Sequence, residues 1–266
     1  IRREALLEAA DLYVKAESLD KALVVYQRFV GYFPQPLEFN IEIRDKIANI
    51  YQNKKDELNY TLQLRTIVDM DARAGEQRTD RTRFIAANAA LVLSAPVMAA
   101  YQAVKLVKPF KENLKIKKAK MKEAIATLSN LIDYKVGNVT AAATFQLAEL
   151  YFDFSQSLTK SERPDNLSAL ELDQYNLAIE EQAFPFEEKA IGIHEKNLVL
   201  LTLTIYNNWI DKSIERLAVL MPARYAKPET HSEFANKFTD ASDAFVSATP
   251  TVITPETRLE KQEKKS

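Results

Sequence analysis

The sequence contains no cysteine and only four glycines among its 266 residues. Without cysteine, the chain can form neither a disulfide nor a thiolate metal site. Scarce glycine disfavours a β protein, because tight turns between strands need it, and abundant Ala, Leu, Lys and Glu favour helices. The formal net charge is −1, so no overall field attracts nucleic acid. These absences predict an all-α protein.

Motifs of catalysis are also missing. The sequence has no G-x-G-x-x-G, no glycine-rich loop ending in Lys-Ser or Lys-Thr, and no glycine-flanked serine. His194 has no His, Asp or Cys three or four residues away, and Asn197 shares its helix face, so a packing histidine is expected. His231 has no companions. Adjacent carboxylates fit solvated helix faces: Glu180 with Glu181, and Glu187 with Glu188. The sequence therefore predicts no catalytic residue, no cofactor site, no metal site and no enzyme activity.

Residues 84–104 form an uncharged run whose length would permit a membrane span. Eight of its residues are alanine, Asn88, Ser94 and Gln102 are polar, and Pro96 lies near its middle. This composition favours a buried, alanine-rich helix pair that turns near residues 94–96. No transmembrane span is expected.

A helix–turn–helix pattern of 34 residues fits the start of the chain when Pro34 is aligned with its closing proline. The small positions fall on Ala10 and Ala22, which allow two helices to approach closely. The large positions are filled by Leu6, Tyr13 and Tyr26. Six of eight signature positions agree, so the unit resembles a tetratricopeptide repeat (TPR).

A second unit repeats this pattern 38 residues later, with Ala48 and Tyr51 in place of the earlier Ala/Tyr pair. Its second helix carries Tyr60, Leu64 and Ile67 on one face and ends near Ala74-Gly75. Tyr60 stands where alanine is usual, so this repeat is degenerate. Residues 1–76 are therefore predicted to form two TPR-like helix pairs.

Residues 77–228 are predicted to form an extended, atypical TPR-like region. Ser168 and Glu171 form a capping box, and Pro185 can begin a helix without losing a hydrogen bond. Residues 136–138 are a helix-stop turn, and Met221-Pro222 ends the last helix. The predicted helices cover residues 79–94, 96–107, 109–134, 139–158, 168–184 and 186–220.

Residues 229–266 are predicted to be a tail, because proline, serine and threonine become frequent and the end is charged. The tail contains an apolar stripe at helical spacing, formed by Phe234, Phe238, Ala241 and Phe245. We expect residues 231–247 to form a short amphipathic helix that docks on the chain's own helices or on a partner.

Eight lysines and one glutamate lie between Lys105 and Lys122, and seven carboxylates lie between Glu171 and Glu195. The lysine segment could bind phosphate groups of nucleic acid or a membrane surface. It has no arginine and little aromatic interleaving, so nucleic acid is not expected as a partner. A solvated face, or a face turned toward the acidic segment, is favoured.

Residues 80–228 resemble the C-terminal region of proteobacterial TPR proteins associated with the cell envelope. The resemblance rests on residues 161–164, 180–190 and 221–227, which read SERP, EEQAFPFEEKA and MPARYAK. It implies an all-α, TPR-like helical-repeat solenoid with longer, degenerate C-terminal helices. Such proteins tend to accompany envelope assemblies of the Tol/TonB or gliding type.

The stacked helix pairs and the missing catalytic motifs predict a non-catalytic scaffold that holds a protein or peptide in a helical groove. The resemblance implies a periplasmic or outer-membrane-associated location, with the cytoplasm as the alternative. Two other functions stay open: a helical accessory domain of an envelope enzyme whose catalytic part is absent, and an architectural oligomer subunit. A groove lined with aromatic residues and asparagine would favour the scaffold. The chain begins at Ile1 without methionine, so we expect a fragment that has lost any signal or lipid anchor.

Overall fold

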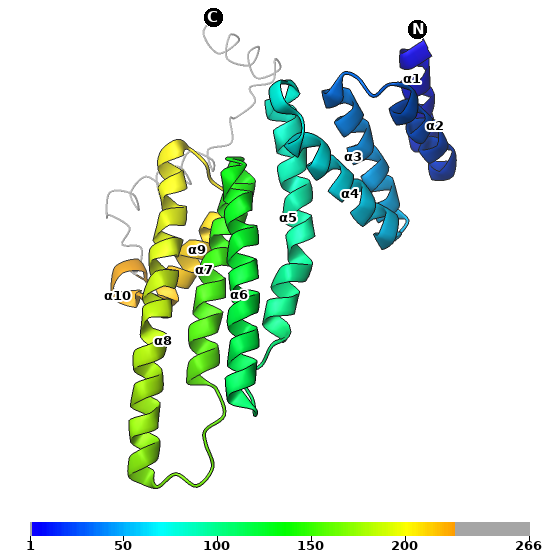
Figure 1. Cartoon of the computed structure of the whole chain (residues 1–266). Helices are drawn as coiled ribbons and strands as arrows, with labels where there is room; N and C mark the ends of the chain where they lie inside the picture. The colour runs from blue at the N-terminus through cyan, green and yellow to red at the C-terminus, as the bar shows by residue number, and fades with distance from the viewer. Residues whose placement is uncertain (1, 227–266) are drawn as a thin grey trace, which may run out of the picture. The chain divides into compact units, whose positions relative to one another are not determined.

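The computed structural model describes residues 2–226, and among these residues there are helices and turns but no strand (Figure 1). The all-α class is therefore confirmed for this part of the chain. The predicted tail helix lies outside the described residues. The helices are α1 (Arg2–Lys15), α2 (Leu19–Tyr32), α3 (Leu37–Asn53), α4 (Glu57–Ala72), η1 (Gly75–Gln77), α5 (Asp80–Ala103), α6 (Phe110–Asp133), α7 (Gly137–Thr159), α8 (Ala169–Leu198), η2 (Val199–Leu203), α9 (Asn208–Leu220) and α10 (Pro222–Tyr225).

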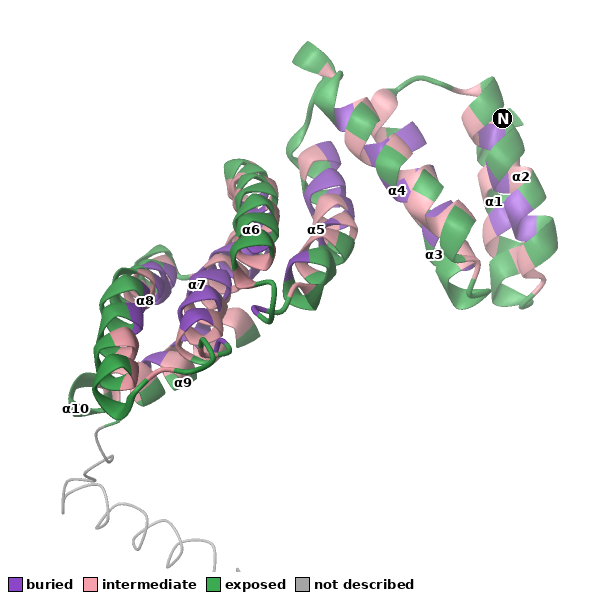
Figure 2. Cartoon of the chain, turned by 60° about the horizontal axis from the view of Figure 1, so that its bottom comes forward, coloured by how far each residue is buried: buried purple, intermediate pink, exposed green. Residues whose placement is uncertain are grey.

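Helices α1 to α4 lie where the sequence predicts two helix pairs, and each packs against the next along the chain. The turns within the two pairs contain Glu17 and Lys55, which both have positive φ (55° and 58°) and lie 38 residues apart. Ala10 and Ala22 are completely buried in one apolar cluster, with Tyr26 between α1 and α3. Figure 2 shows buried positions along both α1 and α2, beside exposed ones.

Replacing Ala22 with leucine should lower the free energy of unfolding by about 1–3 kcal/mol, because the larger side chain would overpack the contact between α1 and α2. Val24→Leu is the matched control, since Val24 is on the same helix and 53% exposed. Urea unfolding followed by circular dichroism measures both variants. A neutral Ala22→Leu would mean that α1 and α2 are not in close contact there.

The predicted turn at residues 94–96 is wrong, because α5 runs unbroken from Asp80 to Ala103 with Pro96 inside it. A proline within a helix removes one backbone hydrogen bond and costs roughly 3 kcal/mol. Buried side chains lie on both sides of this proline, with Ala86 fully buried before it and Tyr101 1% exposed after it. Since packing holds both halves of the helix, α5 continues past Pro96.

The predicted boundary at Pro185 is also wrong, because α8 continues through it to Leu198. Burial of Ala183 and Ala190 against α7 holds both sides of the proline in one helix. The predicted helix 186–220 is instead divided by η2 and a turn. Asn207 begins α9, since its side-chain oxygen accepts hydrogen bonds from the backbone of Trp209 (3.0 Å) and Ile210 (3.3 Å).

The capping box at the start of α8 is confirmed. The Ser168 hydroxyl accepts a hydrogen bond from the Glu171 amide (3.4 Å), and the Glu171 carboxylate accepts one from the Ser168 amide (2.8 Å). The predicted turn at 136–138 lies slightly earlier, because the left-handed residue is Lys135 (φ 55°) and Gly137 begins α7. A Cβ at Gly137 would lie 2.9 Å from Ile205 Cδ1, so glycine lets the segment after η2 approach closely.

Among the described residues, α5 is the helix that is long and apolar enough to cross a membrane. A third of its most apolar window (33%) is buried within the structure. The helix packs against α4 on one side and against α6 on the other. That α5 does not span a membrane stays a prediction.

Candidate functional site

A groove with a volume of about 420 Å³ lies between α1 and α3 and includes two residues of α2. Its apolar lining consists of Val14 from α1, Leu19 from α2 and Ile50 from α3. The other lining residues are polar or aromatic: Asp11, Lys15, Tyr26, Lys46, Asn49 and Asn53. An apolar floor with a few polar groups around it is typical of ligand-binding sites.

The polar rim of the groove has two parts. Asn49 and Asn53 are four residues apart on α3, so their exposed amides lie on one helix face. Lys15 stands on the opposite side, at the end of α1, and forms no ion pair among the described residues. The amides can bond the backbone of a ligand, and the ammonium group can bond a carbonyl or carboxylate.

Asp11 connects two other residues that line the groove, Tyr26 and Lys46. Its carboxylate accepts a hydrogen bond from the Tyr26 hydroxyl, and Lys46 Nζ lies 2.8 Å from its Oδ1 atom. Burial raises the pKa of Asp11, but the hydrogen bonds from Lys46 and Tyr26 outweigh it, so the pKa lies below its usual value. Burial and the Asp11 carboxylate raise the pKa of Tyr26. Lys46 is therefore engaged by Asp11 directly, whereas the charge of Lys15 also acts on Asp11 but Lys15 donates no hydrogen bond to it.

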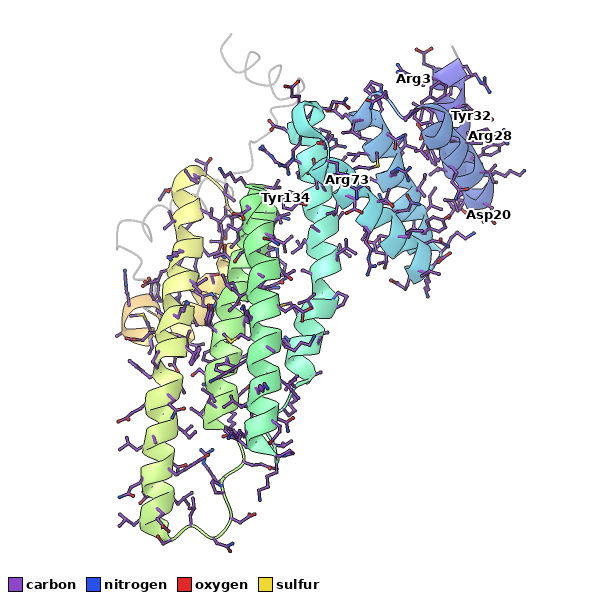
Figure 3. The ribbon with its side chains drawn as sticks, in the orientation of Figure 1. Arg3, Asp20, Arg28, Tyr32, Arg73 and Tyr134 are labelled. Carbon is purple, nitrogen blue, oxygen red and sulfur yellow. The ribbon has the colours of Figure 1, made fainter. Side chains whose placement is uncertain are left out.

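A second ion pair closes the end of this region, where Lys54 after α3 contacts Asp20 of α2. Figure 3 shows Asp20 near one end of α2, and Arg28 and Tyr32 farther along that helix. The two pairs, Asp11–Lys46 and Asp20–Lys54, tie α3 to α1 and α2.

His194 lies in a buried polar cluster that joins three helices. Its side chain is completely buried, with Nδ1 3.3 Å from the Ser213 hydroxyl of α9 and Nε2 3.2 Å from Glu149 Oε1 of α7. Asn197 donates a hydrogen bond to the same hydroxyl (2.9 Å). The order serine–histidine–carboxylate occurs in hydrolases, but Ser213 is also completely buried, so no substrate reaches the hydroxyl here. The cluster packs α7, α8 and α9 together.

Stability should fall in acid because of Glu149. Arg216 donates two hydrogen bonds to its carboxylate (2.7 and 2.6 Å). Burial raises the pKa of Glu149, but His194 and Arg216 together hold it below its usual value. A carboxylate whose pKa is lower in the folded state stabilises the fold at pH values above its pKa in the unfolded chain, which is about 4.3. That stabilisation is lost as the pH falls through the pKa of the folded state.

Urea unfolding at a series of pH values from neutral to acid measures this effect. The free energy of unfolding of the unmodified chain should decline below about pH 4.3. Glu149→Gln should be less stable at neutral pH and should lose less of its stability on acidification. An equally steep decline in both proteins would assign the acid sensitivity to other carboxylates.

Among residues 2–226, no ion pair joins the lysine segment (residues 105–122) to the acidic segment (residues 171–195). Lys117 is almost fully buried, where its ammonium group donates to Val104 O (3.1 Å), lies 3.1 Å from Asp153 and lies 4.1 Å from the Tyr101 ring centroid. Lys108 contacts Asp165, and Lys120 lies 2.8 Å from Glu123. One lysine of the segment is thus a core residue rather than a binding group.

Within residues 2–226, no three His, Asp or Glu side chains are placed to hold a metal ion together. Comparison of the chain with protein-family models, with curated proteins and with solved structures finds no match. The groove between α1 and α3 is therefore the candidate site on its geometry alone.

Proposed function

We propose that this chain is a protein-interaction scaffold of TPR type that holds a short peptide or a partner helix in the groove between α1 and α3. The supporting observation is the combination of an apolar floor with exposed Asn49 and Asn53 amides and the unpaired Lys15. Such a site fits an apolar side chain and leaves donors for the peptide backbone. A partner segment would carry one large apolar residue close to a carboxylate or a chain end.

The paired turns at Glu17 and Lys55, 38 residues apart, support the repeat character of the first four helices. The envelope location and the Tol/TonB- or gliding-like assembly rest on the sequence resemblance. Fractionation of the native cells, with a periplasmic and a cytoplasmic marker enzyme, tests that location.

A displayed library of random dodecapeptides provides the test of the groove. Peptides selected on the unmodified chain should lose binding at least about tenfold on Val14→Asp, because a charge would then face the apolar floor. They should also bind more weakly to Asn49→Ala, which removes backbone contacts. Val24→Asp is the matched control, because Val24 is exposed on α2 and does not line the groove.

Selected peptides that bind Val14→Asp and Asn49→Ala as tightly as the unmodified chain would place recognition elsewhere. The proposed role of the groove would then be wrong. Circular dichroism melting of each variant separates lost binding from lost folding.

A further inference from the structure

Helix α8 carries apolar residues on two opposite sides. The inner row, which includes Ile179, Ala183 and Ala190, is buried in the core that α8 shares with α7. The outer row stays in solvent, although its residues are large: Leu170, Leu177 and Phe184 are 69%, 60% and 59% exposed. In Figure 2 the outer side of α8 is exposed along much of its length. A helix with two apolar sides is typical of a helix between two packing partners.

The outer row has the spacing of a helix-binding seam. Its residues are seven positions apart, which is almost two helical turns, so they form one stripe about 21 Å long. A seven-residue apolar repeat is the pattern by which one helix packs along another. The stripe therefore matches a helix of about three heptads in length better than it matches a compact ligand.

The charges beside this stripe have one sign. Along residues 170–188, four carboxylates lie within roughly 60° of Leu177 around the helix axis, and no lysine or arginine of this segment does. They are Asp173, Glu180, Glu181 and Glu188, all exposed. Among the described residues, none of the four forms an ion pair or a side-chain hydrogen bond. By contrast, Glu149 and Glu195 in the same region are paired with arginines.

We propose that the outer face of α8 docks a helix of a partner protein whose apolar stripe is flanked by lysine or arginine. The same face of a second copy would bring carboxylates against carboxylates, which costs binding energy. An anionic membrane surface is disfavoured for the same reason. A basic helix covers the apolar row and neutralises the four carboxylates together. This proposal concerns a different surface from the groove and does not depend on it.

A designed peptide pair tests the charge selection. The first peptide has about 21 residues in three identical heptads, with leucine at the first and fourth positions, lysine at the fifth and seventh, and alanine elsewhere. The second has glutamate in place of each lysine. Fluorescence anisotropy at low salt should show the lysine peptide binding the full chain at least about tenfold more tightly than the glutamate peptide. Equal binding of the two peptides would overturn the proposal.

Variants of the chain locate the surface. Leu177→Ser should weaken the lysine peptide about tenfold, whereas Leu203→Ser should not, although Leu203 is similarly exposed (63% against 60%). Glu180→Lys combined with Glu181→Lys should reverse the preference toward the glutamate peptide. Unchanged preference in that double variant, or equal loss in both serine variants, would overturn the proposal. So would sedimentation of the free chain as a dimer that Leu177→Ser dissociates, because the occupant would then be a second copy.

Discussion

Replacing Phe154 with alanine should lower the free energy of unfolding by about 3–5 kcal/mol, the largest effect expected from a single substitution in the core of α7 and α8. Phe154 is only 1% exposed, and its ring meets the edge of the Phe186 ring with the centroids 4.6 Å apart. The cavity would lie in the largest apolar cluster among the described residues, which also contains Leu150 and Ile179. Interiors of this kind collapse only partly around a lost ring, so contacts are lost as well as buried area.

Phe184→Ala is the matched control, because it removes the same ring from the exposed side of α8, where Phe184 is 59% exposed. Its effect should stay within about 0.5 kcal/mol. Urea unfolding followed by circular dichroism gives both free energies. An unchanged slope of the free energy of unfolding against urea concentration would show that both variants expose the same surface on unfolding. A loss below about 1 kcal/mol for Phe154→Ala would mean that α7 and α8 are not closely packed at this point.

The positions of most helices could be predicted because their signals are local. The Ser168 capping box and the small residues Ala10 and Ala22 act within one or two turns of helix, and the structure places them as expected. The two wrong boundaries, at Pro96 and Pro185, share one cause. A proline weakens a helix locally, whereas packing on both sides of it is a tertiary effect that sequence spacing does not reveal.

One missed boundary had a readable signal. Asn207 caps α9 through its side chain, and asparagine is among the preferred residues for that position. The boundary was missed because residues 198–205 carry no charge. Without alternating polar and apolar positions, the sequence gives no sign of where one helix ends and the next begins.

The candidate site was much less predictable than the helices. Helical periodicity shows that Asn49 and Asn53 share an outer face of α3, but it does not show that α1 lies opposite them. The partners of His194 likewise come from other helices, with Glu149 on α7 and Ser213 on α9. Such groups meet only through the packing of the helices, so a single sequence could not identify them.

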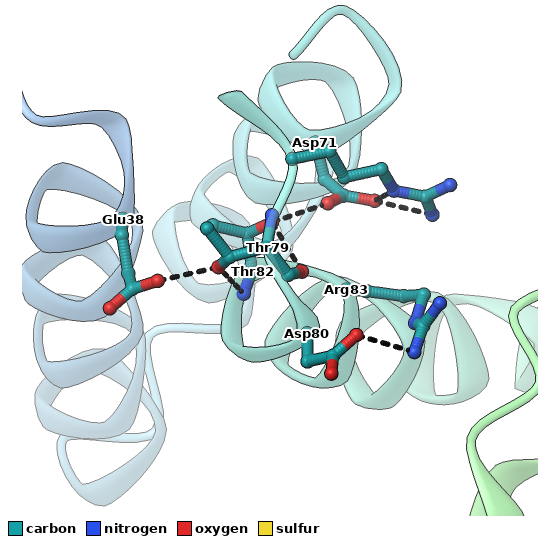
Figure 4. A network of polar contacts seen from close by, with 7 residues as sticks. Glu38, Asp71, Thr79, Asp80, Thr82 and Arg83 are labelled. Carbon is teal, nitrogen blue, oxygen red and sulfur yellow. Dashed lines mark hydrogen bonds and ion pairs between the residues drawn. The ribbon is translucent and has the colours of Figure 1, made fainter. Parts of the chain in front are cut away.

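A buried carboxylate joins α4 to the start of α5. Asp71 has no exposed side-chain surface, and it accepts hydrogen bonds from Arg78 Nε (3.0 Å) and from the Thr82 hydroxyl (2.8 Å). Thr79 caps α5 and donates to Glu38 of α3 (2.5 Å), as Figure 4 shows. The network thus connects the end of α4 with both α5 and α3.

Arg78→Leu should lower the free energy of unfolding by about 3 kcal/mol. Removing one partner of a buried ion pair typically costs about 3–5 kcal/mol, because the other charge stays buried without compensation. The lower end applies here, since the Arg78 side chain is 41% exposed and solvent screens part of its charge. The guanidinium group also lies 5.5 Å from the centroid of the Tyr134 ring at the end of α6, so its loss removes a contact between α6 and the link from α4 to α5.

Arg73→Leu provides the control, because Arg73 is an exposed arginine beside the same link with no ion pair among the described residues. Its effect should stay within about 0.5 kcal/mol. The double variant Asp71→Asn with Arg78→Leu should recover part of the stability that Arg78→Leu loses, because the uncompensated charge is gone. Hydrogen exchange of the amides in residues 71–83 should speed up in Arg78→Leu and slow again in the double variant. The alternative outcome is that the two substitutions are additive, so that the double variant loses the full cost of Asp71→Asn in addition to that of Arg78→Leu. Arg78 would then act by packing rather than by neutralising Asp71.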